Sequence, residues 1–265
     1  NESEVLTAIS KKWLSCSSSS YFQFILSLAR KNFQVDLNKL TDNEKTMCLM
    51  LYYDVWQNPG KFSTLEESIK AIGANPVLVN EIIEILEILL NRVDFVEREI
   101  QLPYKQPLKV HARYTRDQIL VAFGMNTFEK SSSNRIGVGV AENKDLNTEL
   151  LFIDLIKSEK DFSQTTLYND YAISNNLFHW QSQNAARPDR GKGLSYIEHK
   201  ITGKKILLFV RESKKNEYNT TVAYVFIGEG SIQDYYGSKP MSIKWELKEE
   251  LPPYLWHVSA KMAVG

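Results

Sequence analysis

The chain has 265 residues, of which 43% are hydrophobic and 24% charged, a composition ordinary for one large or two average globular domains. The longest apolar runs fall short of the roughly 18 residues that a membrane span needs, and two cysteines cannot build a disulfide scaffold, so the sequence argues against both classes. Residues 1–105 hold 11 basic and 14 acidic residues, and residues 106–265 hold 21 and 18. So small a surplus does not by itself indicate nucleic-acid binding.

The first residues bear on cellular location. The chain begins with Asn1, and residues 1–4 lack the basic and apolar segments of a signal peptide. Cys48 lies in an apolar run, and Cys16 is its only possible partner. We therefore interpret the chain as a piece of a longer protein and expect a reducing, cytoplasmic compartment without membrane contact.

Helical periodicity dominates residues 1–105. Capping boxes begin at Thr41 and Ser63, and Asn75 followed by Pro76 is a typical helix start. The last helix carries an apolar face, which indicates packing on neighbouring helices. Helices are predicted at about 4–14, 21–32, 41–56, 63–73 and 75–92. We expect a helical bundle that serves as a coupler or linker domain over residues 1–105.

The pattern changes after residue 105 to short, β-rich segments bounded by turns. Strands are predicted at 135–140, 150–156, 205–210, 222–227 and 242–247, and short helices at 115–123 and 194–200. The predicted fold class is therefore α+β: an N-terminal helical bundle, then a mainly β, barrel-like domain over residues 106–265 with a few short helices.

Signatures of bound metal or nucleotide are not found in the sequence. The histidines stand at 111, 179, 199 and 257, without the spacing that places two ligands on one helical face. Glycine-rich phosphate-binding loops are also missing. We expect no metal site, no cofactor and no ATP hydrolysis in this chain.

One arrangement imitates a metal-dependent nuclease. Asp189, Glu198 and Lys200 follow the acidic, acidic, lysine order that holds a metal ion beside a phosphate. In such nucleases these groups lie on sheet strands, whereas here Asp189 lies in a turn-rich stretch and the other two on a predicted short helix. We therefore expect no catalytic residue in the chain.

The same stretch holds a short basic segment. Arg187, Arg190 and Lys192 are interleaved with glycines and a proline, which suits contact with phosphates. A solvated surface turn is the alternative interpretation.

Residues 167–184 form the densest aromatic and polar region. A base extracted from a duplex needs flat side chains above and below, with a carboxylate or amide at its edge. The candidates for base or DNA contact are Tyr168, Asp170, Tyr171, His179, Trp180, Gln181, Ser182 and Gln183. The alternative is that Tyr168, Tyr171, Phe178 and Trp180 are core aromatics of a β domain.

Four motifs carry a resemblance to a known family. They are Tyr168-x-Asp170-Tyr171-Ala172, Phe178-His179-Trp180-Gln181-Ser182-Gln183, Leu208-Phe209-Val210-Arg211-Glu212 and Gly237-x-x-Pro240-Met241. Residues 108–251 resemble the domain of unknown function at the carboxyl end of bacterial proteins that fuse a phospholipase-D-type nuclease and a DEAD/DEAH helicase core to it. Among these, the SauUSI-like ATP-dependent type IV restriction endonucleases are the most similar.

The resemblance implies a division of labour. The nuclease and helicase domains would lie upstream in the parent chain and use ATP and magnesium there, and the helical half would couple them. The β half would recognise 5-methylcytosine or 5-hydroxymethylcytosine in double-stranded DNA, by base flipping and, by analogy, in a barrel like the SET-and-RING-associated (SRA) domain. Two alternatives are the metal-dependent nuclease and a protein-docking module without preference for modified DNA.

Overall fold

The computed structural model describes residues 2–56, 61–93, 96–133, 139–156 and 170–264. The chain divides into two compact units, Asn1–Ile136 and Gly137–Gly265, and each is described by itself. Across the described residues, none of the helices is long and apolar enough to span a bilayer.

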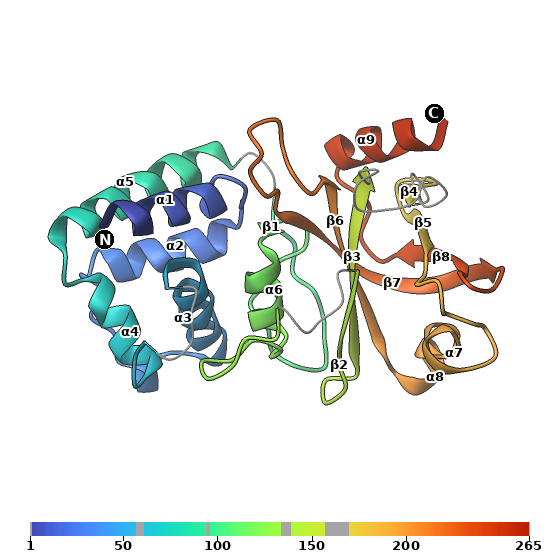
Figure 1. Cartoon of the computed structure of the whole chain (residues 1–265), viewed down its shortest axis with the longest axis horizontal. Coiled ribbons are helices and arrows are strands. Elements are labelled where there is room, and N and C mark those ends of the chain that lie inside the picture. The colour runs from blue at the N-terminus through green and yellow to red at the C-terminus, as the bar shows by residue number, and fades with distance from the viewer. Residues whose placement is uncertain (1, 57–60, 94–95, 134–138, 157–169, 265) are drawn as a thin grey trace. The chain divides into compact units, whose positions relative to one another are not determined.

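The first unit is mainly helical (Figure 1). Its elements are α1 (Glu2–Trp13), α2 (Ser19–Ala29), the 3-10 helix η1 (Leu37–Lys39), α3 (Asp42–Val55), α4 (Leu65–Ile72), α5 (Pro76–Arg92), the short strand β1 (Arg113–Tyr114) and α6 (Arg116–Ala122). Helices α1 and α2 pack against α5, while α3 packs against α4 and α6. The predicted mixed fold class, with helices before a mainly β part, is confirmed.

Side-chain caps begin the helices largely as predicted. Thr41 and Glu44 form the expected capping box, and the Asn75 side chain accepts from the backbone at the start of α5. At α4 the cap is Thr64 and not Ser63, which corrects the predicted start by one residue. The reason is that the Thr64 hydroxyl accepts from the Glu67 amide at 3.1 Å, while the Glu67 carboxylate accepts from the Ser63 amide at 3.0 Å and leaves Ser63 outside the helix.

A buried carboxylate joins four helices of the first unit. Asp54 of α3 accepts hydrogen bonds from Trp13 Nε1 (2.8 Å), Tyr21 Oη (2.6 Å) and Gln118 Nε2 (2.9 Å). Burial raises the pKa of Asp54, and the nearby Lys12 and the three donors oppose this rise. Because Gln118 lies on α6, the compact helical unit extends well past residue 105, where the change of sequence pattern placed its end.

The second unit is a curved sheet in the strand order β2-β3-β6-β7-β8-β5-β4. The strands are β2 (Val140–Asn143), β3 (Thr148–Ile156), β4 (Tyr171–Ala172), β5 (Leu177–Gln181), β6 (Lys205–Ser213), β7 (Tyr224–Tyr236) and β8 (Ser242–Leu247). Strands β3 and β6 are parallel, and the other neighbours pair antiparallel. The predicted strands at 150–156, 205–210, 222–227 and 242–247 are confirmed, whereas most of 135–140 lies outside the described residues.

Strand β7 holds the two halves of this sheet together. Its first half pairs with β6, with Leu208 opposite Gly228, and its second half pairs with β8 from Gly230 onward. A side chain at Gly230 would meet Leu208 Cδ1 at 2.9 Å and Trp245 Cβ at 3.2 Å, so glycine allows the close approach of the halves there. The barrel-like closure that the sequence predicts stays a prediction, since among the described residues the strand order runs from β2 to β4 without a closing pair.

One apolar core lies between the two halves. Strands β3 and β6 contribute Ile153 and Leu208, and β5 and β8 contribute Trp180 and Trp245. The helices α7 (Gly191–Ile197), α8 (His199–Thr202) and α9 (Pro253–Val264) complete the unit, and Tyr196 of α7 is buried in the same core. Figure 1 shows α9 beside the β4–β5 hairpin, where Ser259 Oγ accepts from the Ala172 amide at 2.5 Å.

Replacing Asp54 with alanine should destabilise the first unit strongly. The change leaves the Trp13, Tyr21 and Gln118 donors buried without an acceptor, and we expect a loss of about 3 kcal/mol in the free energy of unfolding. Urea denaturation followed by tryptophan fluorescence measures this. Glu4→Ala, on the exposed part of α1, is the control, and equal effects of the two changes would contradict the assignment.

The buried His199 should make the second unit sensitive to acid. His199 Nε2 accepts from the Ile232 amide at 3.0 Å, and burial lowers the pKa of the imidazole below its ordinary 6.5. The unfolded chain therefore binds a proton that the folded chain does not, so the free energy of unfolding should fall as pH drops from about 7 to 5. His199→Gln should flatten this dependence, while His257→Gln at an exposed position should leave it intact; a steepening in His199→Gln would refute the explanation.

Candidate functional site

Strand alternation divides the predicted base-contact stretch into two sets of side chains. On β5, Phe178 and Trp180 enter the apolar core, whereas His179 and Gln181 belong to the opposite face. Trp180 is 4% exposed and packs edge-on against Tyr196 with 5.4 Å between ring centroids. Phe178 and Trp180 are thus core aromatics, as the alternative interpretation had it.

Asp170 fixes the backbone at the end of the hairpin. Its Oδ1 accepts from the Gln181 amide at 2.8 Å, and the side chain is buried. A carboxylate held in this way supports the strand and does not present a free edge to a base. Tyr168, the other candidate before β4, lies outside the described residues.

Ser182 and Gln183 join β5 to its surroundings. Ser182 Oγ accepts from the Met241 amide at 2.9 Å, and the Ser182 amide donates to the Met241 carbonyl at 2.9 Å. Gln183 Oε1 accepts from the Tyr196 hydroxyl at 3.0 Å. Both candidates therefore have structural partners already.

The outer face of β4 and β5 carries a row of stacked rings. Tyr171 lies opposite His179 in the strand register, and their ring centroids are 4.7 Å apart with an interplanar angle of 18°. Tyr236 of β7 continues the row, with its hydroxyl 3.4 Å from His179 Nε2. The structure thus brings Tyr171, His179 and Gln181 to one face, and His179 itself is almost covered.

The predicted basic segment is largely engaged in ion pairs. Arg187 forms two 2.8 Å hydrogen bonds with Asp189, and this contact lowers the pKa of Asp189. Lys192 Nζ donates to Glu142 at 2.6 Å and to both oxygens of Glu149 at 2.8 Å. Only Arg190 of the three predicted cations is exposed without an ion pair among the described residues.

Lys192 belongs to a four-membered charge cluster. Glu149 is fully buried on β3, and Lys204 reaches both carboxylates, at 2.7 Å for Glu142 and 3.3 Å for Glu149. Burial raises the pKa of Glu149 and the contact with Lys192 opposes this, while the two carboxylates raise the pKa of Lys192 against its own desolvation. The cluster attaches the start of α7 to the sheet, and Lys192 is therefore not a free phosphate contact.

The nuclease-like residues do not assemble. Asp189 is held by Arg187, Glu198 stands between α7 and α8, and Lys200 Nζ donates to the Ile232 carbonyl at 3.0 Å. None of the three lies on a strand. In the described residues, no three His, Cys, Asp or Glu side chains gather as metal ligands would.

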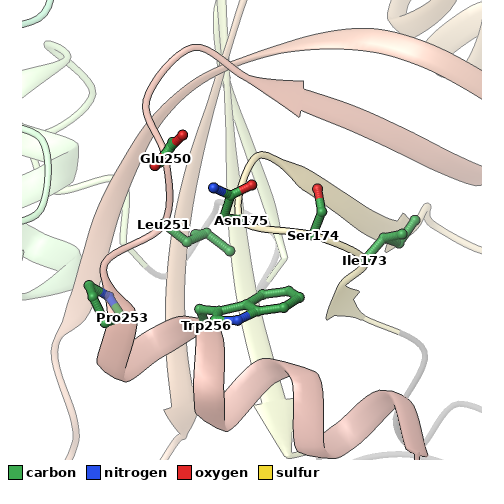
Figure 2. A pocket seen from close by; sticks show the side chains of 7 residues that line it. All are labelled: Ile173, Ser174, Asn175, Glu250, Leu251, Pro253 and Trp256. Atoms are coloured by element: carbon green, nitrogen blue, oxygen red, sulfur yellow. The ribbon is translucent and has the colours of Figure 1, made fainter.

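A pocket opens at the other end of the β4–β5 hairpin, between its turn and the start of α9 (Figure 2). Its volume is about 490 Å³, within the range of small-molecule sites. Ile173, Ser174, Asn175, Glu250, Leu251, Pro253 and Trp256 line it. In Figure 2 the Trp256 indole lies under Leu251 and Asn175, with Glu250 at the rim.

Backbone hydrogen bonds hold the walls of this pocket in place. The Leu251 amide donates to the Asn175 carbonyl at 2.6 Å, and the Leu247 amide donates to the Asn176 carbonyl at 2.7 Å. The hairpin turn is closed by the Ile173 amide, which donates to the Leu177 carbonyl at 2.7 Å. The pocket is therefore preformed, with one aromatic wall, aliphatic contacts and three polar side chains, Ser174, Asn175 and Glu250.

The residues that line the pocket were not among the candidates predicted from the sequence, although three of them lie on the same hairpin. Ile173 and Asn175 lie inside the stretch 167–184, between the quoted motifs, and were passed over because neither is aromatic or charged. Trp256 lies on α9, a helix that was not predicted. Its aromatic residues and the proline at 253 were the signals available.

Curated proteins give no match to the chain. Among solved structures, the crystal structure of Arabidopsis thaliana SUVH6 in complex with SAM is similar with a TM-score of 0.35 and 11% identity. The alignment covers 93% of this chain but 43% of the SUVH6 chain, so the chain spans less than half of that protein. A likeness at this score does not establish a shared fold.

A family model matches more than half of the chain. It is described as a domain of unknown function (DUF3427), and the match runs over residues 108–258. The resemblance found in residues 108–251 is confirmed at this level, while the assignment to type IV restriction enzymes stays a prediction. Because the match covers more than half of its 265 residues, this chain belongs to the DUF3427 family.

Proposed function

We propose that the β-rich unit binds double-stranded DNA and receives one flipped, modified cytosine in the pocket between the β4–β5 turn and α9. The observation that carries the proposal is the composition of the pocket. Trp256 offers a flat ring for stacking, Leu251 and Ile173 offer apolar contact to a 5-methyl group, and Asn175 and Glu250 offer hydrogen bonds.

The free energy that such a site gains from stacking is similar in size to the cost of flipping a base. Flipping costs a few kcal/mol, and one stacking contact returns roughly 1–3 kcal/mol. A carboxylate such as Glu250 accepts from the exocyclic amine of cytosine, which adds to the return. One buried methyl group contributes only about 0.8 kcal/mol, so we expect the preference for methylated DNA to be modest in this chain alone.

In the parent protein this unit would act as the target-recognition part of an ATP-dependent, SauUSI-like type IV restriction endonuclease. The helical unit would couple it to upstream helicase and nuclease domains, which would use ATP and magnesium. This chain would itself be non-catalytic and need no cofactor. Greater fidelity would then come from ATP-driven steps of the parent that follow recognition.

The two alternatives have less support. A nuclease would need Asp189, Glu198 and Lys200 together, and each is engaged or placed elsewhere. A docking module without preference for modified DNA would have no use for a preformed pocket with an aromatic wall. We therefore retain DNA recognition as the proposed function.

Changes in the pocket should remove the preference for modified DNA. In fluorescence-anisotropy titrations with matched duplexes, with and without one 5-methylcytosine, in EDTA and at fixed salt, Trp256→Ala should weaken binding to the methylated duplex about tenfold or more, from the loss of one stacking contact. Asn175→Ala, at an exposed turn position, should weaken it by a smaller factor without affecting folding.

Ile201→Ala is the matched control, because Ile201 is an exposed apolar residue on α8 of the same unit. It should bind both duplexes as the unchanged chain does. Equal affinity of the unchanged chain for the two duplexes would refute recognition of modified cytosine. A preference that survives in both Trp256→Ala and Asn175→Ala would place the base elsewhere.

Lys192→Ala should reduce stability and leave DNA affinity unchanged. Lys192 is the partner of the buried Glu149, but Lys204 remains and Lys192 is partly exposed, so we expect a loss of about 1–2 kcal/mol. Thermal unfolding and the same titrations measure the two effects. Weaker DNA binding with unchanged stability would instead make Lys192 a phosphate contact.

A further inference from the structure

The pocket has two walls that come from separate parts of the chain. Ile173 lies on the β4–β5 turn, and Trp256 lies on α9 (Figure 2). The distance between these two side chains therefore depends on the contacts that join the turn to the helix. One such contact is the hydrogen bond from the Leu251 amide to the Asn175 carbonyl at 2.6 Å, which lies before the helix begins.

A second contact lies within α9. Ser259 Oγ accepts from the Ala172 amide at 2.5 Å. Strand β4 is the last in the order of the sheet, so among the described residues one side of its backbone has no neighbouring strand. Ala172 is 2% exposed, and without the hydroxyl its amide would be buried and lack an acceptor. The Ser259 side chain, itself fully buried, therefore completes this edge of the sheet.

The Ser259–Ala172 hydrogen bond connects the two pocket walls by short paths. On one side, Ala172 directly precedes Ile173. On the other side, Ser259 follows Trp256 by three residues, which places them on neighbouring positions of the helix, about 4.5 Å apart along its axis. Ser259 is not among the residues that line the pocket. Its hydroxyl thus acts on the pocket only through the position of the helix.

We propose that Ser259 is a positioning residue of the pocket, whose hydroxyl holds the Trp256 indole where it can stack on a base beside the β4–β5 turn. The nature of the ligand, a flipped pyrimidine base, rests on the proposed function, whereas the placement of Trp256 does not. A binding site needs its side chains held within about 0.5 Å of the productive arrangement, by packing and by hydrogen bonds from residues behind them. Ser259 supplies such a hydrogen bond.

Other side chains also anchor α9, so loss of this hydrogen bond should loosen the helix and not detach it. Leu251 and Leu255 are buried in the apolar core of the unit. Trp256 is only partly buried against that core. Of these three side chains, the Trp256 ring is the least restrained by burial and should move most when the hydroxyl is removed.

Fluorine NMR of the whole chain, labelled with 5-fluorotryptophan, tests the placement of Trp256 without DNA. The chain has five tryptophans, and the resonance of Trp256 is identified by its loss in Trp256→Phe. Ser259→Ala should shift or broaden this resonance and leave those of Trp13 and Trp56, in the first unit, unchanged. An unchanged Trp256 resonance would overturn the proposal.

Anisotropy titrations with the matched duplexes test the effect on binding. Ser259→Ala should weaken binding to the methylated duplex about threefold to tenfold, less than Trp256→Ala does because the ring remains, and leave the unmethylated duplex unaffected. Ser259→Cys keeps the size of the side chain and offers a weaker acceptor, so its effect should be intermediate. If Ser259→Ala fails to fold, Ser259→Cys carries both tests.

Ser195→Ala is the matched control, because the Ser195 hydroxyl also bonds to backbone, donating to the Lys192 carbonyl of α7 at 2.8 Å. It should change neither the Trp256 resonance nor the affinity for either duplex. Circular dichroism of each variant confirms that the fold is retained. Equal effects of Ser195→Ala and Ser259→Ala would contradict a specific role for Ser259.

The outcomes separate this inference from the proposed function. Equal affinity of the unchanged chain for both duplexes would end the proposed function, and the fluorine spectrum would still decide whether Ser259 places Trp256. If Trp256→Ala lost the preference while Ser259→Ala kept it despite a shifted Trp256 resonance, the hydrogen bond would be structural only, and the inference would be wrong.

Discussion

The β-rich unit depends on the passage of β7 from one half of its sheet to the other. At this point the buried Glu229 pairs with Lys205 of β6 at 3.1 Å and with Lys248, just after β8, at 2.6 Å. The Lys248 amide also donates to the Glu229 carbonyl. Because leaving a buried carboxylate unpaired is costly, both lysines are held where the half-sheets meet. The pocket, between the β4–β5 turn and α9, belongs to the half that this junction positions.

The two ends of the β4–β5 hairpin are held by different groups: backbone hydrogen bonds at one end and side-chain hydrogen bonds at the other. At one end the turn is fixed by backbone hydrogen bonds to residues 247–251, which leaves the side chains of Ile173 and Asn175 free to line a pocket. At the other end the side chains of Asp170 and Ser182 accept hydrogen bonds that hold β5 to its neighbours. The residues with the most suggestive chemistry in the sequence are therefore the ones that build the scaffold, and plainer residues face the open space.

Local patterns predicted much of the fold and less of the candidate site. Helix caps such as Thr41 and Asn75 act over three or four residues, so the sequence alone reveals them. Strand β5 was missed although Phe178, His179, Trp180 and Gln181 alternate between apolar and polar, because the strand has only five residues and the same side chains also suit contact with a base. Which face of a strand a side chain occupies follows from pairing with β8, and that pairing is not encoded locally.

The number of charged residues says little about DNA binding by this chain, for a physical reason. A surplus of three positive charges over residues 106–265 suggests little, because two buried carboxylates engage four of the lysines that the count includes. Glu149 holds Lys192 and Lys204, and Glu229 holds Lys205 and Lys248. Arg190 and Lys239 are exposed and form no ion pair among the described residues. Nucleic-acid affinity depends on where unpaired basic side chains gather, so a net charge of zero does not by itself exclude DNA binding.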